Sequence, residues 1–283
     1  MALLWHRSVA ATIGPAGGTG VRVGTGEDGS RGLDLDFVVT MTDDPEPNQL
    51  RLQVWNPSPN TVAKAQDPDA VVRLTVGHRG DDGDGVVRQV FVGEPVPGGV
   101  RFAPSGNGDQ LLEIEARDGG RAYSLGRLET SFATATTGRQ VFDAIAGELG
   151  APLGLVDLDP GLDFPQGIVL LGPARRLLDE LVASMGRRWY FRDGALHVVR
   201  EGDDTGEAAV VFSAEAGNLI GSPAPTDRGI EVRGLLAPTL RPGKVFRVES
   251  KEYSGFYVCT DLRFQGSSYR GRFDVVAKGV PRG

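Results

Sequence analysis

Three histidines and one cysteine are the side chains of this sequence best suited to bind a metal or act as nucleophiles. His6, His78 and His197 lie far apart, no pair has helical metal-ligand spacing, and Cys259 has no cysteine partner. Cys259 also lies in an alternating strand pattern, YVCTDL, with no histidine nearby in sequence to activate its thiol. The pattern favours a packed strand cysteine, and the sequence predicts no catalytic, metal or cofactor site.

Carboxylates gather in three turn-like stretches that could serve a glycosidase or hold calcium. They are Asp81, Asp82 and Asp84; Asp157, Asp159 and Asp163; and Asp203 and Asp204. A glycosidase needs two carboxylates facing each other across a cleft, and DDGDG lacks the spacing and the terminal Glu of a helix-loop-helix calcium loop. Turn chemistry explains each cluster more simply. A cell-wall hydrolase that uses Asp157, Asp159, Asp163 or Glu180 stays an alternative.

The stretch RRWYFR mixes arginines with aromatic residues, a combination that can stack on single-stranded nucleic acid. It precedes Asp193-Gly194, a strong hairpin signal between two alternating runs. Alternation sends Trp189 and Phe191 to one face and Arg188, Tyr190 and Arg192 to the other. The pattern favours one buried and one solvated face of a hairpin.

Short strands are predicted on both sides of this hairpin region. Alternating runs such as LDLDFVVTMT, QLRLQVW and QLLEIEA recur about every ten residues between residues 33 and 117, which is typical of a sandwich or barrel. The Gly-rich start lacks the Lys-Ser/Thr of a phosphate loop, and we expect a flexible entry with a short strand at Val21 to Val23. Strand patterns return after residue 205.

Two helices are predicted in the middle of the chain. TTGRQVFDAIAGELG has an apolar stripe, with Thr136 or Thr137 as the N-cap and Gly150 closing the end. GPARRLLDELVASMG repeats this design, with Pro173 at the first helical position and Gly186 after the last turn. The fold class is therefore mainly β with an α+β insert and two β-barrel-like domains. The expected domains are 1–130, 131–205 and 206–283, with residues 101–135 as an alternative part of the last.

The stretch IEVRGLLAPTLRPGKVFRVES predicts a strand, a rigid turn and a strand. Pro238 and Pro242 stop the strand ladder, and Gly243 can adopt a positive φ. Phe246 and Val248 then share a face that can return to the core. We interpret this stretch as a fixed corner of a barrel wall, where a slip of one residue would expose the buried face.

Charge and composition exclude several classes of function. The formal net charge is −7, which argues against nucleic acid as a surface ligand, since such proteins carry a basic footprint. The start of the chain is not a signal peptide, and no segment has the length of a membrane span. The sequence thus predicts a soluble protein made in the cytoplasm, without membrane insertion.

The order of these pieces resembles the tail hub proteins of bacteriophages with contractile tails and their relatives in other injection machines. The four matching stretches are DFVVTMTDDPEPNQLRLQVWNPSPNTVAK, VRLTVGHRG with RQVFVGEP, LEIEARDGGRAYSLGRLETSFATATTGRQVFDAIAGELG, and GLLAPTLRPGKVFRVES with SGFYVCTDLRFQGSSYRGRFDVVAKG. They extend from about residue 33 to 280. Two details depart from the family: Phe273 stands where a Trp is frequent, and the turn QGSSYRG lacks an acidic residue, which leaves the contacts of that turn open.

The resemblance implies a non-enzymatic structural role in the virion tail, after synthesis in the host cytoplasm. It implies a homotrimeric ring in which two related domains per subunit mimic six-fold symmetry. Such a ring joins a hexameric tail tube, or a distal tube protein, to a central trimeric spike, with the tape-measure protein and other baseplate proteins as further candidate partners. DNA would only pass through its bore, and an acidic protein discourages sticking.

Two further classes stay open as alternatives: the tail-associated cell-wall hydrolase named above, and a carbohydrate- or receptor-binding β protein. A binding protein of that kind needs exposed aromatic residues, yet aromatics make up only 7% of the chain and most lie at alternating strand positions. Within the structural reading, a phage tail, a tailocin and a gene-transfer particle are equally compatible with the sequence.

Overall fold

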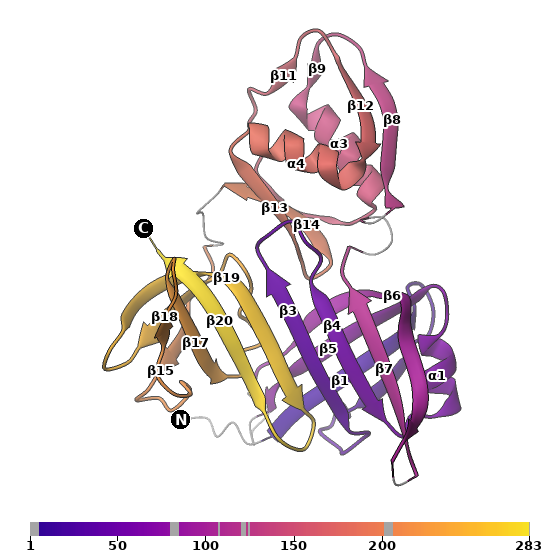
Figure 1. Cartoon of the computed structure of the whole chain (residues 1–283), viewed down its shortest axis with the longest axis vertical. Helices are drawn as coiled ribbons and strands as arrows, with labels where there is room; N and C mark the ends of the chain where they lie inside the picture. The colour runs from indigo at the N-terminus through magenta and orange to yellow at the C-terminus, as the bar shows by residue number, and fades with distance from the viewer. Residues whose placement is uncertain are drawn as a thin grey trace. The chain divides into compact units, whose positions relative to one another are not determined.

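The computed structural model describes residues 6–79, 85–106, 108–119, 123, 125–200 and 206–282. Its chain divides into two compact units. The larger unit comprises Met1–Met41, Asn48–Arg117 and Asp204–Gly283, and the smaller comprises Thr42–Pro47 and Asp118–Asp203. The fold is mainly β with an α+β insert, which confirms the predicted fold class (Figure 1).

The larger unit contains two sets of five strands that share one topology. The first strand set consists of β3 (Leu35–Thr42), β4 (Gln49–Trp55), β5 (Ala70–Arg79), β6 (Val87–Ser105) and β7 (Asp109–Arg117), paired in the order β3-β4-β7-β6-β5. The second strand set consists of β16 (Ala224–Pro225), β17 (Ile230–Leu235), β18 (Val245–Glu249), β19 (Ser254–Ser267) and β20 (Phe273–Pro281), paired in the order β16-β17-β20-β19-β18. In both sets the order along the sheet is first, second, fifth, fourth, third. Residues 101–117 therefore pair within the first strand set.

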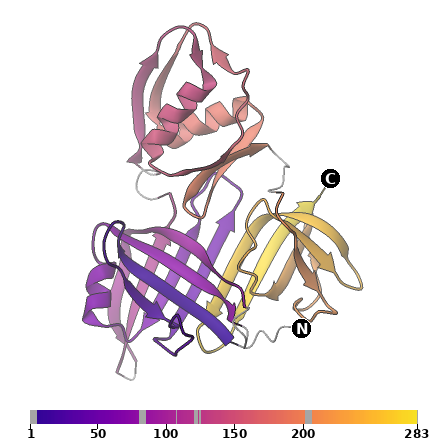
Figure 2. The same cartoon turned by 180° about the vertical axis from the view of Figure 1, so that it is seen from behind.

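One continuous sheet runs through both strand sets, because β19 of the second set pairs with β3 of the first. Alternate residues of its strands, such as Leu50, Leu52 and Val54 of β4, are buried in a single apolar core that extends through both sets. β1, β5 and the first part of β6 form a layer that lies behind β3, β4 and β7 in Figure 1 and in front of them in Figure 2. The sheets curl over this core without closing into barrels.

The N-terminal stretch is more ordered than its sequence predicts. The expected short strand is confirmed as β2 (Val21–Gly24), but the expectation of a flexible entry is wrong for β1 (His6–Pro15), which pairs with β2 and along its whole length with β5. Residues 8–11 of β1 are all buried, so the strand shows no alternation of polar and apolar residues. Its strand signal is therefore invisible to a period-two search.

Two connections complete the larger unit. Helix α1 (Pro59–Ala65) links β4 to β5, and the Ser58 hydroxyl caps its N-terminus by accepting from the Thr61 N–H at 3.1 Å. Strand β15 (Val210–Ser213) precedes the second set and pairs in parallel with β18.

In the residues that the structure describes from end to end, the smaller unit shows two helices, a three-stranded sheet and two small ribbons. The helices are α3 (Gly138–Leu149) and α4 (Ala174–Ser184). The sheet has the order β10 (Leu153–Val156), β14 (Ala195–Arg200), β13 (Arg187–Arg192); the ribbons pair β8 (Arg127–Phe132) with β12 (Ile168–Pro173) and β9 (Thr136–Thr137) with β11 (Asp163–Phe164). Their apolar side chains form a core of their own.

Both predicted helices are confirmed, with one correction at a cap. Thr137 and Gln140 form a capping box at the start of α3, and Gly150 ends this helix in the left-handed conformation. Pro173 is the N-cap of α4, with extended backbone angles, and not its first helical residue. No helix within the described ranges is long and apolar enough to span a membrane.

The Asp193-Gly194 hairpin is confirmed, but one of its faces is not solvated as the sequence suggests. Both turn residues have positive φ, and Trp189 and Phe191 lie in the core of the smaller unit. On the opposite face Tyr190 is also buried, stacked on His197 with ring centroids 5.7 Å apart. The expectation of a solvated face is wrong, because burial here extends to both sides of β13.

Candidate functional site

The candidate site is the contact between β19 and β3, which we call the seam, because it joins the two strand sets into one wall. The tip of the β19–β20 hairpin, residues 267–272, lies against the first set at this point. Arg7 of β1 holds the tip: its guanidinium donates to the carbonyl oxygens of Ser267, Arg270 and Gly271 at 3.3, 2.9 and 2.8 Å. A single arginine thus satisfies carbonyls that a tight turn would otherwise leave unpaired.

The same hairpin tip makes polar contacts with the segment that enters β3. The Gly32 N–H donates to the Tyr269 hydroxyl at 2.8 Å, and Arg31 lies over the Tyr269 ring, 4.3 Å from its centroid. Arg270 forms an ion pair with Asp34 at 3.0 Å. The turn QGSSYRG, whose contacts the sequence left open, therefore binds β3 and the segment that enters it through its backbone and through four side chains, those of Ser267, Ser268, Tyr269 and Arg270.

An aromatic cluster fills the apolar side of the seam. Phe273 of β20 packs edge-on against Phe37 of β3, with centroids 6.2 Å apart, and against His78 of β5 at 5.0 Å. Gly266 permits this approach, because a Cβ there would lie 2.6 Å from Phe273 and 3.1 Å from Phe37. Phe273 thus fills an internal contact between the two strand sets.

The predicted corner after β17 supplies a second bond between the strand sets. Arg241 is buried and donates to the carbonyl oxygens of Pro238 and Leu240, both at 2.8 Å, within the corner itself. It also donates to the carbonyl oxygen of Gln89 in β6 at 2.6 Å. Because a buried arginine needs such partners, the corner is fixed against the first strand set.

Gly243 has the positive φ that the sequence predicts, at 80°. Its N–H donates to the Cys259 carbonyl at 2.7 Å, and the Cys259 N–H returns a bond to the Lys244 carbonyl at 2.9 Å. β17 pairs with β20 whereas β18 pairs with β19, so the corner carries the chain across the sheet. The interpretation as a structural corner agrees with these bonds.

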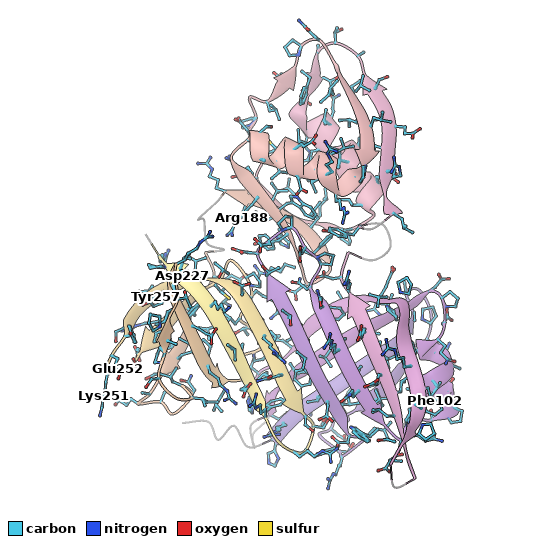
Figure 3. All side chains as sticks on the ribbon, viewed as in Figure 1. Phe102, Arg188, Asp227, Lys251, Glu252 and Tyr257 are labelled. Atoms are coloured by element: carbon cyan, nitrogen blue, oxygen red, sulfur yellow. The ribbon has the colours of Figure 1, made fainter. Side chains whose placement is uncertain are left out.

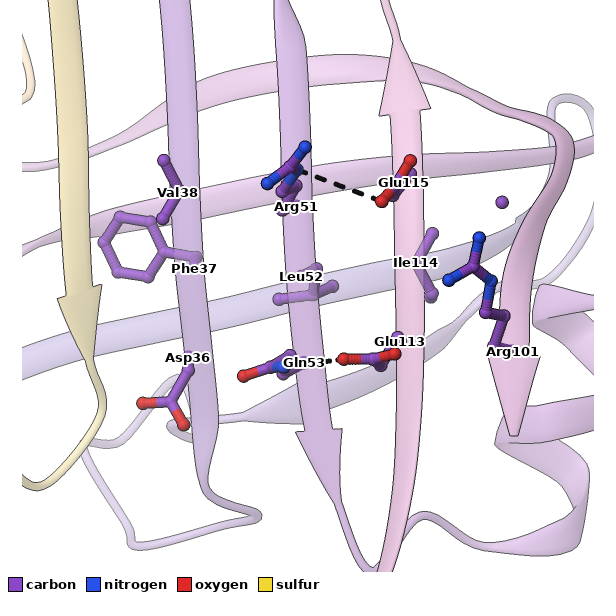
Figure 4. A pocket seen from close by; sticks show the side chains of 11 residues that line it. Asp36, Phe37, Val38, Arg51, Leu52, Gln53, Arg101, Glu113, Ile114 and Glu115 are labelled. Carbon is purple, nitrogen blue, oxygen red and sulfur yellow. Dashed lines mark hydrogen bonds and ion pairs between the residues drawn. The ribbon is translucent and has the colours of Figure 1, made fainter. Parts of the chain in front are cut away.

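The face of the sheet opposite the core is polar and carries cross-strand pairs in the first strand set (Figure 4). Arg51 and Glu115 lie opposite each other with an ion pair of 3.9 Å, and Gln53 donates to Glu113 at 2.8 Å. Arg101 of β6 pairs with Glu113 in the ladder. These side chains line a depression in the sheet surface. The charged and amide groups that line it are paired with one another across the strands.

The second strand set continues this polar face. Arg233 bonds Asp274, Gln265 donates to the same carboxylate at 2.8 Å, and Lys278 lies 3.8 Å from Glu231. Each basic side chain named on this face has an acidic neighbour. The acidic and basic side chains named here therefore balance one another on this face.

The residues first considered for chemistry are dispersed. His6 lies in β1, His78 in β5 and His197 in β14, and Cys259 is fully buried in β19, as a packed strand cysteine should be. Within the part of the chain that the structure describes, no three His, Cys, Asp or Glu residues gather as a metal site would need.

The candidate hydrolase carboxylates have structural partners. Asp157 pairs with Arg187 at 3.2 Å, Glu180 pairs with Arg176 at 2.8 Å one helical turn away, and Asp159 accepts from the Gly161 N–H in a turn. Asp163 is exposed in β11. Asp81, Asp82 and Asp84 of the DDGDG stretch, and Asp203 and Asp204, lie outside the described residues.

His197 is packed tightly within the smaller unit. Its Nδ1 accepts from the Leu155 N–H at 3.1 Å, and Gly154 makes room for the ring, since a Cβ there would lie 2.3 Å from the imidazole. Burial, and then the positive charge of Arg192, lower the pKa of His197. A neutral imidazole that accepts at Nδ1 fits this environment and indicates a structural role.

A short repeat in the sequence marks the strand edges of both sets. VRFAPSG ends β6 at residues 100–106, and LRFQGSS ends β19 at residues 262–268, with Arg, Phe and Ser at matching places. Phe102 pairs with Leu112 of the following strand, as Phe264 pairs with Val275. The repeat was available as a sequence signal, but its meaning depends on the shared strand order.

The fold is shared with solved structures of tail proteins. The 43 kDa tail protein of prophage MuSo2 from Shewanella oneidensis matches with a TM-score of 0.63 at 12% identity, covering 98% of both chains. A tail protein from Neisseria meningitidis MC58 matches with a TM-score of 0.64 at 12% identity, covering 97% of this chain and 96% of that one. This chain therefore has the fold of phage tail proteins along nearly its whole length.

A component of a bacterial secretion machine has the same fold. The Escherichia coli c3393 protein, described as a type VI secretion component similar to the T4 tail proteins gp27 and gp5, matches with a TM-score of 0.57 at 12% identity. The match covers 88% of this chain and 74% of that one. No protein-family model matches the sequence, and no curated protein matches it either. The predicted resemblance to tail and injection-machine proteins is thus confirmed at the level of the fold.

Proposed function

We propose that this protein is the structural hub of a phage tail tip or baseplate: a homotrimeric ring that joins the hexameric tail tube to the trimeric spike. The observation that carries the proposal is the duplicated strand order within one continuous sheet. Two equivalent strand sets in each of three subunits give six equivalent sets, which matches a hexameric tube on one side of the ring. The three subunits themselves match a trimeric spike on the other side.

The polar face of the continuous sheet supports a bore for DNA. In this ring the polar face lines the channel and the apolar core lies outside it. Arg233 and Lys278 each have an acidic neighbour there, so the positive charges of these two residues are balanced within the lining. Binding of DNA depends on neutralising phosphates with free basic side chains, so DNA passes without being held.

The proposed partners are the tail tube or a distal tube protein, the central spike, the tape-measure protein and other baseplate proteins, with the virion tail as the location. No catalytic step is assigned to the chain. The fold shared with a type VI secretion component that is described as similar to gp27 and gp5 supports this partnership with tube and spike.

Light scattering after size exclusion tests the proposal, followed by mixing with purified tail tube and spike proteins. We expect a mass near three times the 30.0 kDa of the chain and stable complexes with both partners. A persistent monomer that ignores tube and spike contradicts the proposal. Clearing of peptidoglycan in a zymogram, lost on changing Asp157 or Glu180, supports the hydrolase alternative instead.

A further inference from the structure

We infer that the outer edge of β6 in one subunit pairs with β16 of the next, in the way that β19 pairs with β3 inside the chain. The inference rests on the proposed ring and names the surfaces that close it. At the seam, the fourth strand of one set lies beside the first strand of the other. In a ring with a head-to-tail interface, β6 and β16 are the fourth and first strands that remain without such a neighbour.

The outer edge of β6 has two features of an interface: an unpaired strand edge and an exposed apolar side chain. Residues 100–105 pair with β7 on one side, and within the described ranges no strand pairs with their other side. Phe102 lies on this edge (Figure 3) and is 41% exposed, whereas Phe264, at the matching place in β19, is fully buried at the seam. An exposed strand edge with a large apolar side chain needs a cover.

The backbone of this edge is free to bond. Both backbone groups of Gln110 are engaged with Asn56: the Asn56 N–H donates to the Gln110 carbonyl at 2.8 Å, and the Gln110 N–H donates to the Asn56 side chain at 2.9 Å. The opposite residue, Pro104, therefore directs its carbonyl away from β7, and by the alternation of an antiparallel ladder so does Phe102. Phe102 thus presents an N–H donor at the free edge.

The outer edge of β16 is complementary to it. The Thr226 N–H donates to the Gly229 carbonyl at 2.9 Å, which makes the next pair, Pro225 with Ile230, a non-bonded pair of the ladder. Pro225 therefore presents its carbonyl outward and, being proline, has no N–H to offer. Two β16 edges cannot bond each other through Pro225, whereas the Phe102 N–H can donate to it. This chemistry favours a head-to-tail contact over a two-fold one.

The seam sets the register of the inferred contact. The Ser268 N–H donates to the Leu35 carbonyl at 2.9 Å, and Gly266 lies against Phe37. Pairing runs in opposite directions on the two strands, so Gln265 lies beside Val38.

The corresponding residues in the inferred contact are Ala103 and Ala224. Ala103 follows Phe102 as Gln265 follows Phe264. The residue pairs can be followed strand by strand, from Phe102 to β3 in the first set and from Phe264 to β16 in the second. By this comparison Ala224 of β16 is the equivalent of Val38 of β3. Both alanines are exposed and lie on the polar face of the sheet.

Disulfide crosslinking of the full chain tests this register. In the double variant Ala103→Cys with Ala224→Cys, mild oxidation of the trimer should yield a covalent trimer on a non-reducing gel. Each single variant should stay uncrosslinked, and a mixture of the two singles should give covalent dimers, because a head-to-tail contact needs one cysteine of each kind. Native Cys259 is fully buried, which keeps the background low.

Each outcome decides between the ring and its assigned edges. A trimer by light scattering that forms no disulfide contradicts the β6–β16 contact and leaves the proposed hub intact. Single variants that crosslink to themselves indicate a two-fold contact and also overturn the inference. A monomer at all concentrations contradicts both the inference and the proposed hub.

A charge placed on the β6 edge gives a second test that does not depend on oxidation. Phe102→Glu should abolish the trimer peak while the circular dichroism spectrum stays that of the parent. The matched control is Phe256→Glu, because Phe256 is 47% exposed but lies on the β18-paired half of β19, away from the inferred contact. A Phe102→Glu variant that remains trimeric contradicts the inference, as does an equal loss of trimer in the control.

Discussion

The seam and the outer edge of β6 carry the same Arg-Phe pair followed by a serine three residues later, yet the phenylalanine is buried at one and exposed at the other. At the seam, Phe264 is fully buried, and the hairpin tip beyond it is held by Arg7, by the bond from Gly32 to Tyr269 and by the ion pair between Arg270 and Asp34. At the outer edge, Phe102 occupies the matching place in VRFAPSG and is 41% exposed. The strand order around both residues is the same.

The difference teaches that burial of this phenylalanine depends on a neighbouring strand set and not on the local sequence. Where the chain supplies a first strand, as β3 does at the seam, the edge is covered. At the outer edge of β6 the chain has no further first strand to supply, so this edge stays exposed. A protein that builds one contact within its chain and leaves its equivalent unfilled has the geometry of a subunit of a closed ring.

Alanine at the two equivalent phenylalanines should separate the seam from the edge most clearly. Phe264→Ala removes a fully buried ring and should lower the free energy of unfolding by about 3–5 kcal/mol. Phe102→Ala should cost about 1 kcal/mol or less in the monomer, because much of its ring already contacts water. Urea unfolding, at dilutions where light scattering gives the mass of one chain, measures both. Equal costs would break the comparison.

Arg241 tests the second contact between the strand sets, which the corner after β17 supplies. Arg241→Met leaves the carbonyls of Pro238, Leu240 and Gln89 without this donor in a buried place, and should cost about 3 kcal/mol. The control is Arg101→Met on the exposed polar face, where we expect a change within about 0.5 kcal/mol. Thermal or urea unfolding reads out both variants. A tolerant Arg241 would show that the seam alone joins the two strand sets.

Gly243 tests whether the corner needs its backbone conformation. Gly243→Val forces a β-branched residue to φ 80° and should destabilise the larger unit by about 2 kcal/mol, impairing folding or ring assembly. Gly147→Ala is the control: Gly147 lies on the exposed side of α3 with open space at its Cβ, and alanine there should stabilise by about 0.5–1 kcal/mol. A Gly243→Val variant that folds and assembles like the parent would show that the corner needs no glycine.

The features that sequence could predict are those set by a few adjacent residues. The capping box of α3, the Asp193-Gly194 hairpin and the positive φ of Gly243 are all determined by local backbone and side-chain chemistry. Helical and strand periodicity likewise identified the fold class. The turn and cap signals needed no knowledge of distant partners.

The features that sequence missed depend on distant partners or on burial from both sides. β1 has no alternation because both of its faces are covered, so it was mistaken for a flexible entry. Arg7 and the carbonyl of Gly271 are 264 residues apart, and Arg241 is 152 residues from Gln89. No spacing rule connects residues so far apart. The solvated face assigned to Tyr190 failed because both faces of β13 are buried, and alternation cannot indicate burial on both sides.

The smaller unit offers a region in which a loss of stability should leave both seam and edge unchanged. Burial lowers the pKa of His197 below its usual 6.5, so between these two values the unfolded chain binds more protons than the folded one. The stability that His197 contributes is therefore present above about pH 6.5 and is lost as the pH falls through its lowered pKa. Protonation also ends the bond that Nδ1 accepts from Leu155.

Hydrogen exchange between pH 8 and pH 5, corrected for the intrinsic effect of pH, should locate this loss. Amides of β10 and β14 should lose protection as the pH falls, while those of β3 and β19 at the seam keep theirs. His197→Phe should remove the pH dependence, because phenylalanine binds no proton, whereas His6→Gln at the exposed start of β1 should retain it. If protection at the seam fell in parallel with that of β14, the two units would unfold as one, and stability at the seam could not be assigned to its own contacts.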